Sequence, residues 1–264
     1  MRTIASRQHD VVKQFRDLAA TPDPSGARLL LDGAHLVREA RRAGALIEVA
    51  AVAVPRLDGG SEEGALARDL AESGVEVVAA GDRVFDAMSP VRTPSGIVAI
   101  ARRPPATAAD ICRSAGFVLA AIDVQDPGNL GALLRAAEAG GATGVLVSGA
   151  SANPFSWKAV RGSMGSVLRL PVATAPTVAG VLTCMKKFGL HTIASTPRGG
   201  VDPDALQWTG KAGLLLGGEG PGLDEQTIAA CDARVTIPMA QPVESLNVAI
   251  AGALLVYAAR RQRV

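Results

Sequence analysis

The sequence contains few of the residues from which several common kinds of functional site are built. Aromatic residues make up only 3% of the 264 residues, which argues against a nucleic-acid site that depends mainly on stacked aromatic rings. The three histidines, His9, His35 and His191, are scattered and have no neighbouring ligand pattern, so the sequence predicts neither a bound metal nor a Ser-His-Asp triad. The Gly-x-Ser-x-Gly turn that is typical of serine hydrolases is missing as well.

Cysteine and long apolar runs are also scarce. Cys112, Cys184 and Cys231 are odd in number and lack metal-ligand spacing, as expected for reduced core residues of a cytosolic protein. The first residues lack the apolar core of a signal peptide. The longest apolar run, residues 248–259, is shorter than the ~20 residues of a membrane-spanning helix. We therefore expect a cytoplasmic protein with no membrane partner.

Charge of one sign is not in excess. The chain contains 27 Lys and Arg residues and 25 Asp and Glu residues, which gives a formal net charge of +2. Any nucleic-acid surface must therefore arise from the arrangement of the charges, because the bulk charge is nearly balanced. Hydrophobic residues make up 48% of the chain, enough for a sizeable core in one large domain or two ordinary ones.

Short apolar runs alternate with amphipathic stretches, which predicts an α/β protein. The expected strands lie near residues 27–31, 47–54, 75–79, 96–101, 117–122, 144–147, 167–170, 191–195, 213–216 and 234–237. The expected helices of the first part lie near residues 9–18, 34–42, 62–73 and 81–88. Pro104 and Pro105 indicate a linker. We therefore predict an N-terminal domain over residues 1–104, a linker over 105–116 and a C-terminal domain over 117–264.

Three loops each follow an expected strand and precede a helical pattern. We expect them to meet at the carboxyl ends of strands in one parallel sheet, where such sheets bind ligands. The first loop begins at Asp123. Pro127 and Gly128 predict a turn, Asn129 is expected to cap the next helix, and Arg135 lies less than two turns from that helix start. A helix cap followed by a surface arginine is the alternative interpretation of this loop alone.

The second loop contains Gly217, Gly218, Gly220 and Gly222 around Glu219. Its glycine spacing fits neither G-x-G-x-x-G nor a phosphate loop that ends in Gly-Lys-Ser or Gly-Lys-Thr. Such a turn allows a ligand to approach the backbone closely, so main-chain groups are expected to bind it. Glu219 suits a cationic ligand, and a solvated loop carboxylate is the alternative.

The third loop follows the strand end at Ile237–Met239 and leads into a helix expected near residues 246–261. Ser245 is expected to cap this helix, although the Glu or Gln of a capping box is missing. Asn247 then lies in the first turn, where a polar side chain requires a partner. The helix is apolar almost all round, which is typical of burial in its own core or against a second subunit.

In this order, the three loops resemble the signature motifs of the SpoU/TrmH family of RNA ribose 2′-O-methyltransferases, part of the SPOUT class. The family patterns are Asn-x-Gly…Arg, Gly-x-Glu-x-x-Gly and Ile-Pro-Met…Ser-Leu-Asn-Val. The matching residues are Asn129, Gly131, Arg135, Gly217, Glu219, Gly222, Ile237–Met239 and Ser245–Val248. The resemblance spans about residues 117 to 262, and three ordered motifs are far more specific than any one of them.

Two N-terminal segments, residues 29–40 and 93–99, resemble in outline the small ribosomal-protein-like domain of the same family, with Asp32 in place of the usual Glu. The resemblance implies that this α/β domain binds the RNA substrate. It further implies that the C-terminal parallel-sheet SPOUT domain threads a deep trefoil knot, and that two copies form a homodimer through the knotted domains.

The resemblance also implies S-adenosylmethionine as the cofactor, bound largely by backbone atoms. The expected cofactor-binding residues are Thr196, Gly217, Gly218, Ile237, Met239 and Leu246. The implied reaction methylates a ribose 2′-hydroxyl, a poor nucleophile that must be oriented and deprotonated. The family assigns that role to Arg135, although a guanidinium holds its proton so tightly that it rarely releases it. We therefore expect Arg135 to position the target phosphate and hydroxyl and to stabilise negative charge, with the base left open.

The other residues expected to shape the catalytic site are Asn129, Glu219, Ser245 and Asn247. Arg161 is a further expected RNA contact, with a solvated helix arginine as the alternative. A non-catalytic RNA-binding or ribosome-assembly protein that keeps the fold is a rival function, which the retention of these four residues together with Arg135 disfavours. A nucleotide-dependent oxidoreductase is disfavoured by the missing dinucleotide fingerprint. Analogy with the family favours rRNA over tRNA as the substrate.

Overall fold

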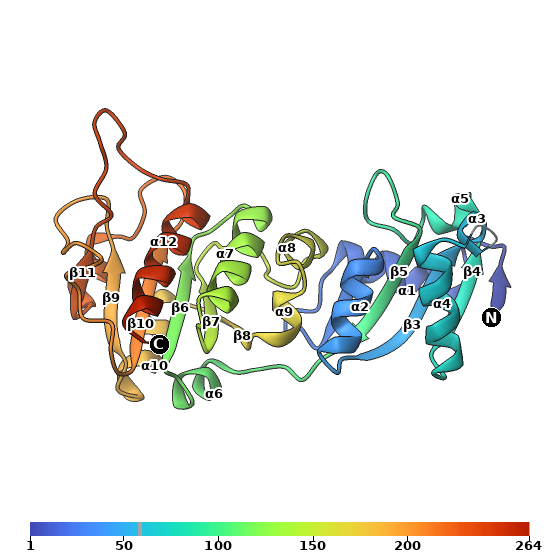
Figure 1. The fold of residues 1–264 in the computed structure, drawn as a ribbon, viewed down its shortest axis with the longest axis horizontal. Helices are drawn as coiled ribbons and strands as arrows, with labels where there is room; N and C mark the ends of the chain where they lie inside the picture. Colours follow the sequence, from blue (N-terminus) through green and yellow to red (C-terminus); the bar gives the residue numbers. More distant parts are fainter. Residues whose placement is uncertain (58–59, 264) are drawn as a thin grey trace. The chain divides into compact units, whose positions relative to one another are not determined.

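The computed structural model describes residues 1–57 and 60–263, and the chain divides into two compact units. The N-terminal unit comprises residues 1–104 and 155–169, and the C-terminal unit comprises residues 105–154 and 170–264 (Figure 1). The division after Pro104 lies beside the predicted linker. Residues 155–169, which we had assigned to the C-terminal domain, belong instead to the N-terminal unit, where Trp157 packs against the hydrophobic core.

The N-terminal unit is built on a mixed five-stranded sheet with the order β1-β4-β3-β5-β2. Its strands are β1 (Arg2–Ile4), β2 (Arg28–Asp32), β3 (Leu46–Ala53), β4 (Glu76–Ala80) and β5 (Ile97–Arg102). Its helices are α1 (Asp10–Ala20), α2 (Ala34–Arg42), α3 (Val54–Leu57), α4 (Glu62–Glu72), α5 (Asp82–Phe85), α8 (Trp157–Gly162) and α9 (Ser166–Arg169). Strand β5 runs antiparallel to both of its neighbours, β2 and β3.

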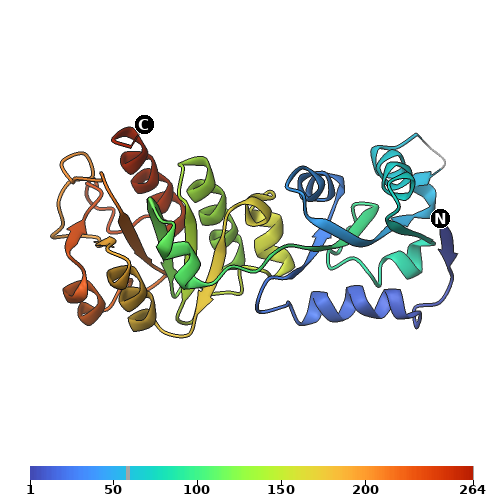
Figure 2. The ribbon, with the colours of Figure 1, turned by 90° about the horizontal axis from the view of Figure 1, so that it is seen from below.

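Helices cover both faces of this sheet. On one face, Phe15 of α1 and Phe85 of α5 pack against Leu30, Val49 and other strand residues in one buried cluster. Helices α2 and α4 contact the sheet on the opposite face, and Figure 2 shows them on the other side from α1. The strands and long helices predicted here are confirmed within about two residues. Strand β1 was not predicted, because three residues are too few for a periodic pattern.

The C-terminal unit contains a six-stranded sheet with the order β11-β9-β10-β6-β7-β8, in which every paired strand runs parallel. Its strands are β6 (Phe117–Ile122), β7 (Gly144–Ser148), β8 (Val172–Ala175), β9 (His191–Ser195), β10 (Ala212–Gly217) and β11 (Ala233–Val235). Its helices are α6 (Ala108–Arg113), α7 (Pro127–Ala139), α10 (Val178–Lys187), α11 (Glu225–Ala230) and α12 (Val248–Arg261). The expected α/β class with a parallel sheet is confirmed.

Two helical layers enclose this sheet. Helices α6, α10 and α11 share one buried cluster with residues of the central strands. Helices α7 and α12 lie side by side on the other face, as Figures 1 and 2 show. All six residues of β6 are buried, which explains why this strand reads as one continuous apolar run.

One predicted strand is wrong. Residues 167–170 were expected to form a strand, but Ser166–Arg169 form helix α9, and the strand β8 begins at Val172 after Pro171. A short apolar run has no period that separates a strand from one turn of buried helix, so the sequence alone could not decide. Among the described residues, no helix is long and apolar enough to cross a membrane.

Candidate functional site

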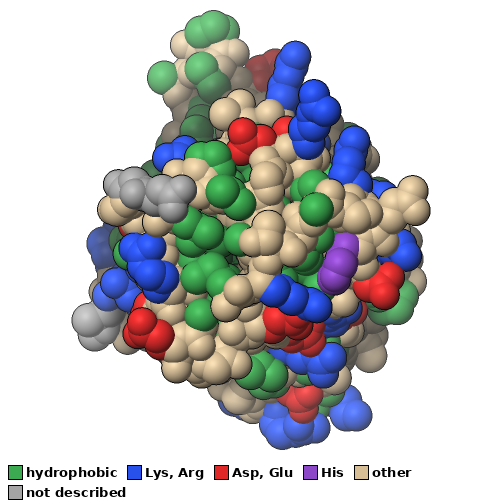
Figure 3. Space-filling view, turned by 90° about the vertical axis from the view of Figure 1, so that its right-hand side faces the viewer, with side chains coloured by type: hydrophobic (Ala, Val, Ile, Leu, Met, Phe, Trp, Pro, Cys, Tyr) green, Lys and Arg blue, Asp and Glu red, His purple; other side chains and the backbone are tan. Residues whose placement is uncertain are grey.

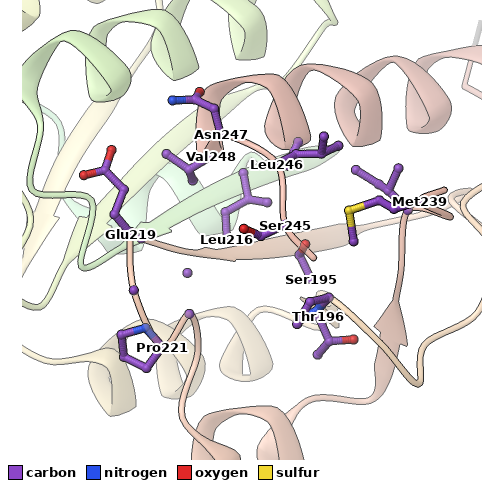
Figure 4. A pocket seen from close by; sticks show the side chains of 17 residues that line it. Ser195, Thr196, Leu216, Glu219, Pro221, Met239, Ser245, Leu246, Asn247 and Val248 are labelled. Atoms are coloured by element: carbon purple, nitrogen blue, oxygen red, sulfur yellow. The ribbon is translucent and has the colours of Figure 1, made fainter. Parts of the chain in front are cut away.

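A cavity of about 380 Å³ lies at the carboxyl end of the C-terminal sheet. It is lined by residues that follow β9, β10 and β11 and by the start of α12 (Figure 4). The lining residues are Ser195, Thr196, Pro197, Leu216, Gly217, Gly218, Glu219, Gly220, Pro221, Gly222, Ile237, Met239, Ser245, Leu246, Asn247, Val248 and Ala251. The second and third predicted loops therefore meet in one place, as expected for strand ends of a parallel sheet.

The first loop leads into α7, whose start differs from the prediction. Asp126, rather than Asn129, is the N-cap, and its carboxylate accepts a hydrogen bond of 2.7 Å from the backbone nitrogen of Asn129. Pro127 occupies the first helical turn, where its fixed φ suits the helix and its missing N–H costs nothing. The helix thus begins three residues earlier than expected, and the side chain of Asn129 is available for contacts outside α7.

The second loop places glycines where the backbone is crowded. A Cβ atom at Gly218 would collide with the carbonyl oxygen of Asp123, and one at Gly217 would collide with the backbone of Gly222 and Leu223. Asp123 itself adopts a left-handed conformation with φ of 56° at the end of β6, an unusual backbone for a non-glycine residue. The loop therefore packs so tightly against the end of β6 that only glycine fits at position 218.

The third loop ends at a different cap from the one predicted. Asn247, not Ser245, is the N-cap of α12, and its Oδ1 accepts hydrogen bonds from the backbone nitrogens of Ala249 (2.9 Å) and Ile250 (3.3 Å). The side-chain oxygen Oδ1 of Asn247 accepts from two backbone N–H groups that have no partner within the helix, which explains why Asn247 takes the capping position. Ser245 instead lines the cavity.

A chain of side-chain hydrogen bonds joins all three loops. Asn247 Nδ2 donates to Asn129 Oδ1 at 3.1 Å, and Asn129 Nδ2 donates to the Glu219 carboxylate. Figure 4 shows Glu219 and Asn247 at the same end of the cavity. The polar partner predicted for Asn247 is thus Asn129, and the partner of Asn129 is Glu219.

The six residues predicted to bind the cofactor all line the cavity: Thr196, Gly217, Gly218, Ile237, Met239 and Leu246. Thr196 is nearly buried, and its backbone nitrogen donates to the carbonyl of Val235 at 2.9 Å, which fixes this strand end beside β11. Sequence reasoning missed Ser195 and Leu216, although both stand in the last two positions of a strand that leads to the site. Their position at a strand end is the signal that could have identified them.

The two predicted RNA-binding arginines lie away from the cavity wall. Arg135 is exposed on α7 and is not among the residues that line the cavity. Arg161 is exposed on α8, in the N-terminal unit, where its positive charge acts on Asp32. Burial raises the pKa of the Asp32 carboxyl, and hydrogen bonds from Ser89 and Ser95 and the charge of Arg161 oppose that shift. The structure therefore groups Asn129, Glu219, Ser245 and Asn247 around the cavity and leaves both arginines outside it.

A parallel sheet with a glycine-lined cavity at its carboxyl edge defines a ligand-binding α/β protein. The family model of the SpoU rRNA Methylase family matches residues 116–257, more than half of the chain. An uncharacterized tRNA/rRNA methyltransferase of Synechocystis is 32% identical over 268 residues, covering 99% of this chain and 94% of the relative. The 23S rRNA (guanosine(2553)-2′-O)-methyltransferase RlmP of Bacillus subtilis is 28% identical over 258 residues, covering 97% of this chain and 98% of the relative.

Solved structures that are similar to this chain are also methyltransferases. The AdoMet-bound rRNA methyltransferase from Sinorhizobium meliloti superimposes with a TM-score of 0.83 at 28% identity, covering 98% of this chain and 97% of that one. The SpoU methyltransferase AviRb from Streptomyces viridochromogenes, in complex with the cofactor AdoMet, gives 0.82 at 25% identity, covering 97% and 98%. The chain belongs to the SpoU rRNA methylase family. It is accordingly an RNA 2′-O-methyltransferase with S-adenosylmethionine (AdoMet) as methyl donor, which confirms the expected activity and cofactor.

Proposed function

We propose that the chain methylates a ribose 2′-hydroxyl of structured rRNA and that the cavity at the carboxyl end of the C-terminal sheet holds the methyl donor. The observation that carries this proposal is the hydrogen-bonded chain Asn247–Asn129–Glu219. It joins one polar side chain from each of the three loops at the edge of a cavity that is otherwise lined by glycines, small polar residues and apolar residues. A protein that only binds RNA has no need of this arrangement.

The cavity fits the donor in size and in charge. Its volume of about 380 Å³ falls in the range of small-molecule sites, roughly 300–1,000 Å³. Gly217 and Gly218 line the cavity with main-chain atoms alone, because the neighbouring backbone leaves no room for a side chain at either position. Glu219 is the charged residue among the described lining residues, and its carboxylate favours a ligand with a positive centre, such as the sulfonium of the donor.

The residues of the network have distinct roles in this proposal. When bound, the donor would supply a methyl group on a cationic sulfur. The 2′-hydroxyl loses its proton and its oxygen takes the methyl, while the sulfur–carbon bond breaks and a neutral thioether leaves. Asn129 donates a hydrogen bond to the Glu219 carboxylate, and Asn247 donates one to Asn129. In this proposal the two bonds orient Glu219 and Asn129 toward the ribose. Arg135 binds the phosphate next to the target ribose and stabilises the negative charge that develops on the 2′-oxygen. Its exposure outside the cavity wall suits a residue that meets the RNA rather than the donor.

The N-terminal unit is the RNA substrate-binding domain in this proposal, of the small ribosomal-protein-like kind. Many of its arginines are engaged in ion pairs, including Arg2 with Glu76 and Arg41 with Asp69. On the face seen in Figure 3, Lys and Arg side chains are interspersed with Asp and Glu. Recognition therefore depends on shape and on individual exposed arginines such as Arg161 rather than on a broad positive field.

An rRNA substrate is favoured over tRNA by a relative whose name states its substrate and whose similarity spans both units. RlmP of Bacillus subtilis is named for a guanosine of 23S rRNA, and its similarity covers 97% of this chain, both units included. Because this similarity spans the whole chain, it includes the N-terminal unit, which we propose selects the RNA.

The proposal also includes a homodimer formed through the C-terminal unit. Ile250, Leu254 and Tyr257 are 55%, 49% and 46% exposed, and their spacing places them on one face of α12. The other face of α12 packs on α7, where a Cβ atom at Gly252 would collide with Leu133. An exposed apolar stripe of this kind is typical of a contact with a partner, here a second copy. A Leu254→Glu variant is expected to be monomeric in light scattering, and an unchanged mass would reject this interface.

The trefoil knot of the family belongs to the same proposal. Strand β11 lies at the edge of the sheet, yet the chain that follows it returns to place α12 against α7 and the interior strand β10. We propose that this return from the edge of the sheet to its interior threads the knot.

Calorimetric titration with S-adenosylmethionine and methylation of isolated rRNA and tRNA with labelled donor test the proposal. Leu246 lines the cavity, so Leu246→Arg is expected to abolish donor binding, whereas Leu46→Arg, on an exposed residue of the N-terminal unit, serves as the control. A wild-type protein that does not bind the donor, or a Leu246→Arg variant that binds it normally, would overturn the assignment of the cavity. Labelling of tRNA in preference to rRNA would overturn the choice of substrate.

A further inference from the structure

We propose that Arg198 and Glu244 bind the amino-acid end of the methyl donor in a second cavity that adjoins the first. This inference rests on the proposed function, because it requires the first cavity to hold the nucleoside part of the same molecule. The ligand class is a zwitterionic α-amino acid group, which carries one ammonium and one carboxylate.

The second cavity has a volume of about 280 Å³ and is formed by the segments that follow β9 and β11. Its lining residues are Pro197, Arg198, Thr236, Ile237, Pro238, Met239, Gln241, Pro242, Val243 and Glu244. Pro197, Ile237 and Met239 line both cavities, so the two spaces share a wall. The two cavities are therefore adjacent, as a ligand that extends from one into the other requires.

The two cavities differ in the charges that they offer. Glu219 is the charged side chain among the described lining residues of the first cavity, which include neither Lys nor Arg. The carboxylate of the ligand would find no cationic partner in the first cavity, and Glu219 would repel it. The second cavity contains one cation and one anion, Arg198 and Glu244, which match the two charges of an α-amino acid group.

Arg198 and Glu244 are available for such a ligand. Their closest atoms, Arg198 Nη2 and Glu244 Oε1, are 3.6 Å apart, longer than a good charge-assisted hydrogen bond. The two side chains are 77% and 83% exposed, so solvent screens their mutual attraction and little is lost when they separate. A ligand carboxylate can pair with the guanidinium while its ammonium pairs with Glu244.

The backbone that carries Arg198 is held on both sides. The backbone nitrogen of Thr196 donates to the carbonyl of Val235, and that of Gly200 donates to Oγ1 of Thr236 at 2.9 Å. These bonds tie the short segment after β9 to the end of β11, so the Cα of Arg198 has a fixed place at the cavity. Its side chain remains free to reach a ligand.

The test compares two ligands that differ in the amino-acid group. S-adenosylhomocysteine carries that group, and 5′-methylthioadenosine lacks it. In calorimetric titrations, Arg198→Met and Glu244→Gln are each expected to weaken S-adenosylhomocysteine about tenfold, the effect of one lost charge-assisted hydrogen bond, with less than about a twofold change for methylthioadenosine. Arg113→Met, at an exposed ion-paired arginine on α6, is the matched control and is expected to change neither affinity.

Each other outcome overturns the inference. Equal weakening of both ligands would give Arg198 and Glu244 a structural role in the loop. Unchanged affinity for both, with weaker RNA binding, would assign the second cavity to the RNA. If the wild-type protein binds neither ligand, the proposed donor cavity is overturned as well. If the wild type binds methylthioadenosine but the variants do not weaken S-adenosylhomocysteine, only the role of Arg198 and Glu244 is overturned.

Discussion

Asn247 Nδ2 donates a hydrogen bond of 3.1 Å to Asn129 Oδ1, so the cap of α12 is fastened to the first turn of α7. The direction of this bond is fixed by the cap. Because Asn247 Oδ1 accepts from two backbone nitrogens, its Nδ2 is the group that faces Asn129. Asn129 must then accept with its oxygen and present its own Nδ2 to Glu219. Helix capping therefore determines which atoms meet at the edge of the cavity.

Replacing Asn247 by Asp should separate its role as the cap of α12 from its role as the hydrogen-bond donor to Asn129. The carboxylate still accepts from Ala249 and Ile250, and its charge is favourable at a helix N-terminus, so the free energy of unfolding should change by less than about 1 kcal/mol. The donor to Asn129 is lost, and a carboxylate oxygen would face the oxygen of Asn129. The turnover number should fall roughly tenfold, as expected for one misplaced polar contact in the transition state. Urea denaturation and methyl-transfer kinetics measure the two effects.

Asn247→Ala is the comparison for that variant. It removes the cap as well, so it should lower the free energy of unfolding by about 1 kcal/mol and reduce turnover too. If Asn247→Asp keeps full activity, the bond between Asn247 and Asn129 has no part in catalysis.

Asn129 and Glu219 should act as one unit. The two side chains are joined by a single hydrogen bond, so Asn129→Ala removes its donor and Glu219→Ala removes its acceptor. The double variant should lose little more activity than the worse single variant, with a coupling free energy of about 0.5–3 kcal/mol calculated from kcat/KM. The control pair is Asn129→Ala with Glu225→Ala, because Glu225 is exposed on α11 and its effect should add independently. Additive losses for Asn129 and Glu219 would contradict a shared role.

Much of the fold could be predicted from periodicity. Residues 117–122 form β6 and residues 34–42 form α2 as predicted, because a buried parallel strand and an amphipathic helix each carry a clear pattern. The convergence of the loops after β10 and β11 could also be predicted, since parallel strands end at the same edge of the sheet.

The polar contacts of the site could not be predicted in the same way. Asn129 and Ser245 were expected to be caps, but Asp126 and Asn247 take those positions, and several neighbouring polar residues can satisfy the same helix start. The bond between Asn129 and Asn247 joins residues 118 apart in the sequence. Such a pair depends on how α7 and α12 pack, which no local pattern encodes.

Gly218→Ala should damage the site by sterics alone. The new methyl group would meet the carbonyl oxygen of Asp123, which is backbone and cannot rotate away. We expect the free energy of unfolding to fall by about 1–3 kcal/mol and the affinity for S-adenosylmethionine to fall with it. Gly81→Ala is the control, because a Cβ atom at Gly81 has no neighbour within 4 Å among the described residues. A Gly218→Ala variant with normal stability and normal donor affinity would show that the loop can relax.

Asp32 should make the stability of the protein fall as the pH rises from acid. Burial raises the pKa of its carboxyl above the ordinary value of 3.8, although Ser89 donates a hydrogen bond of 2.8 Å to it. The folded state therefore binds this proton more tightly than the unfolded state, and that advantage disappears as the pH rises through the raised pKa. At neutral pH the folded protein contains a half-buried carboxylate whose desolvation is unfavourable.

Asp32→Asn removes the ionisation and keeps an oxygen that can accept from Ser89. The variant should therefore be more stable than the wild type at pH 7, and the difference should shrink as the pH falls through the raised pKa and level off below the ordinary value of 3.8. Urea denaturation at several pH values measures this difference. Asp17→Asn, at a carboxylate that is 75% exposed on α1, is the control and should change stability by less than about 0.5 kcal/mol. A less stable Asp32→Asn variant at pH 7 would mean that Arg161 and Ser89 stabilise the carboxylate by more than its burial costs.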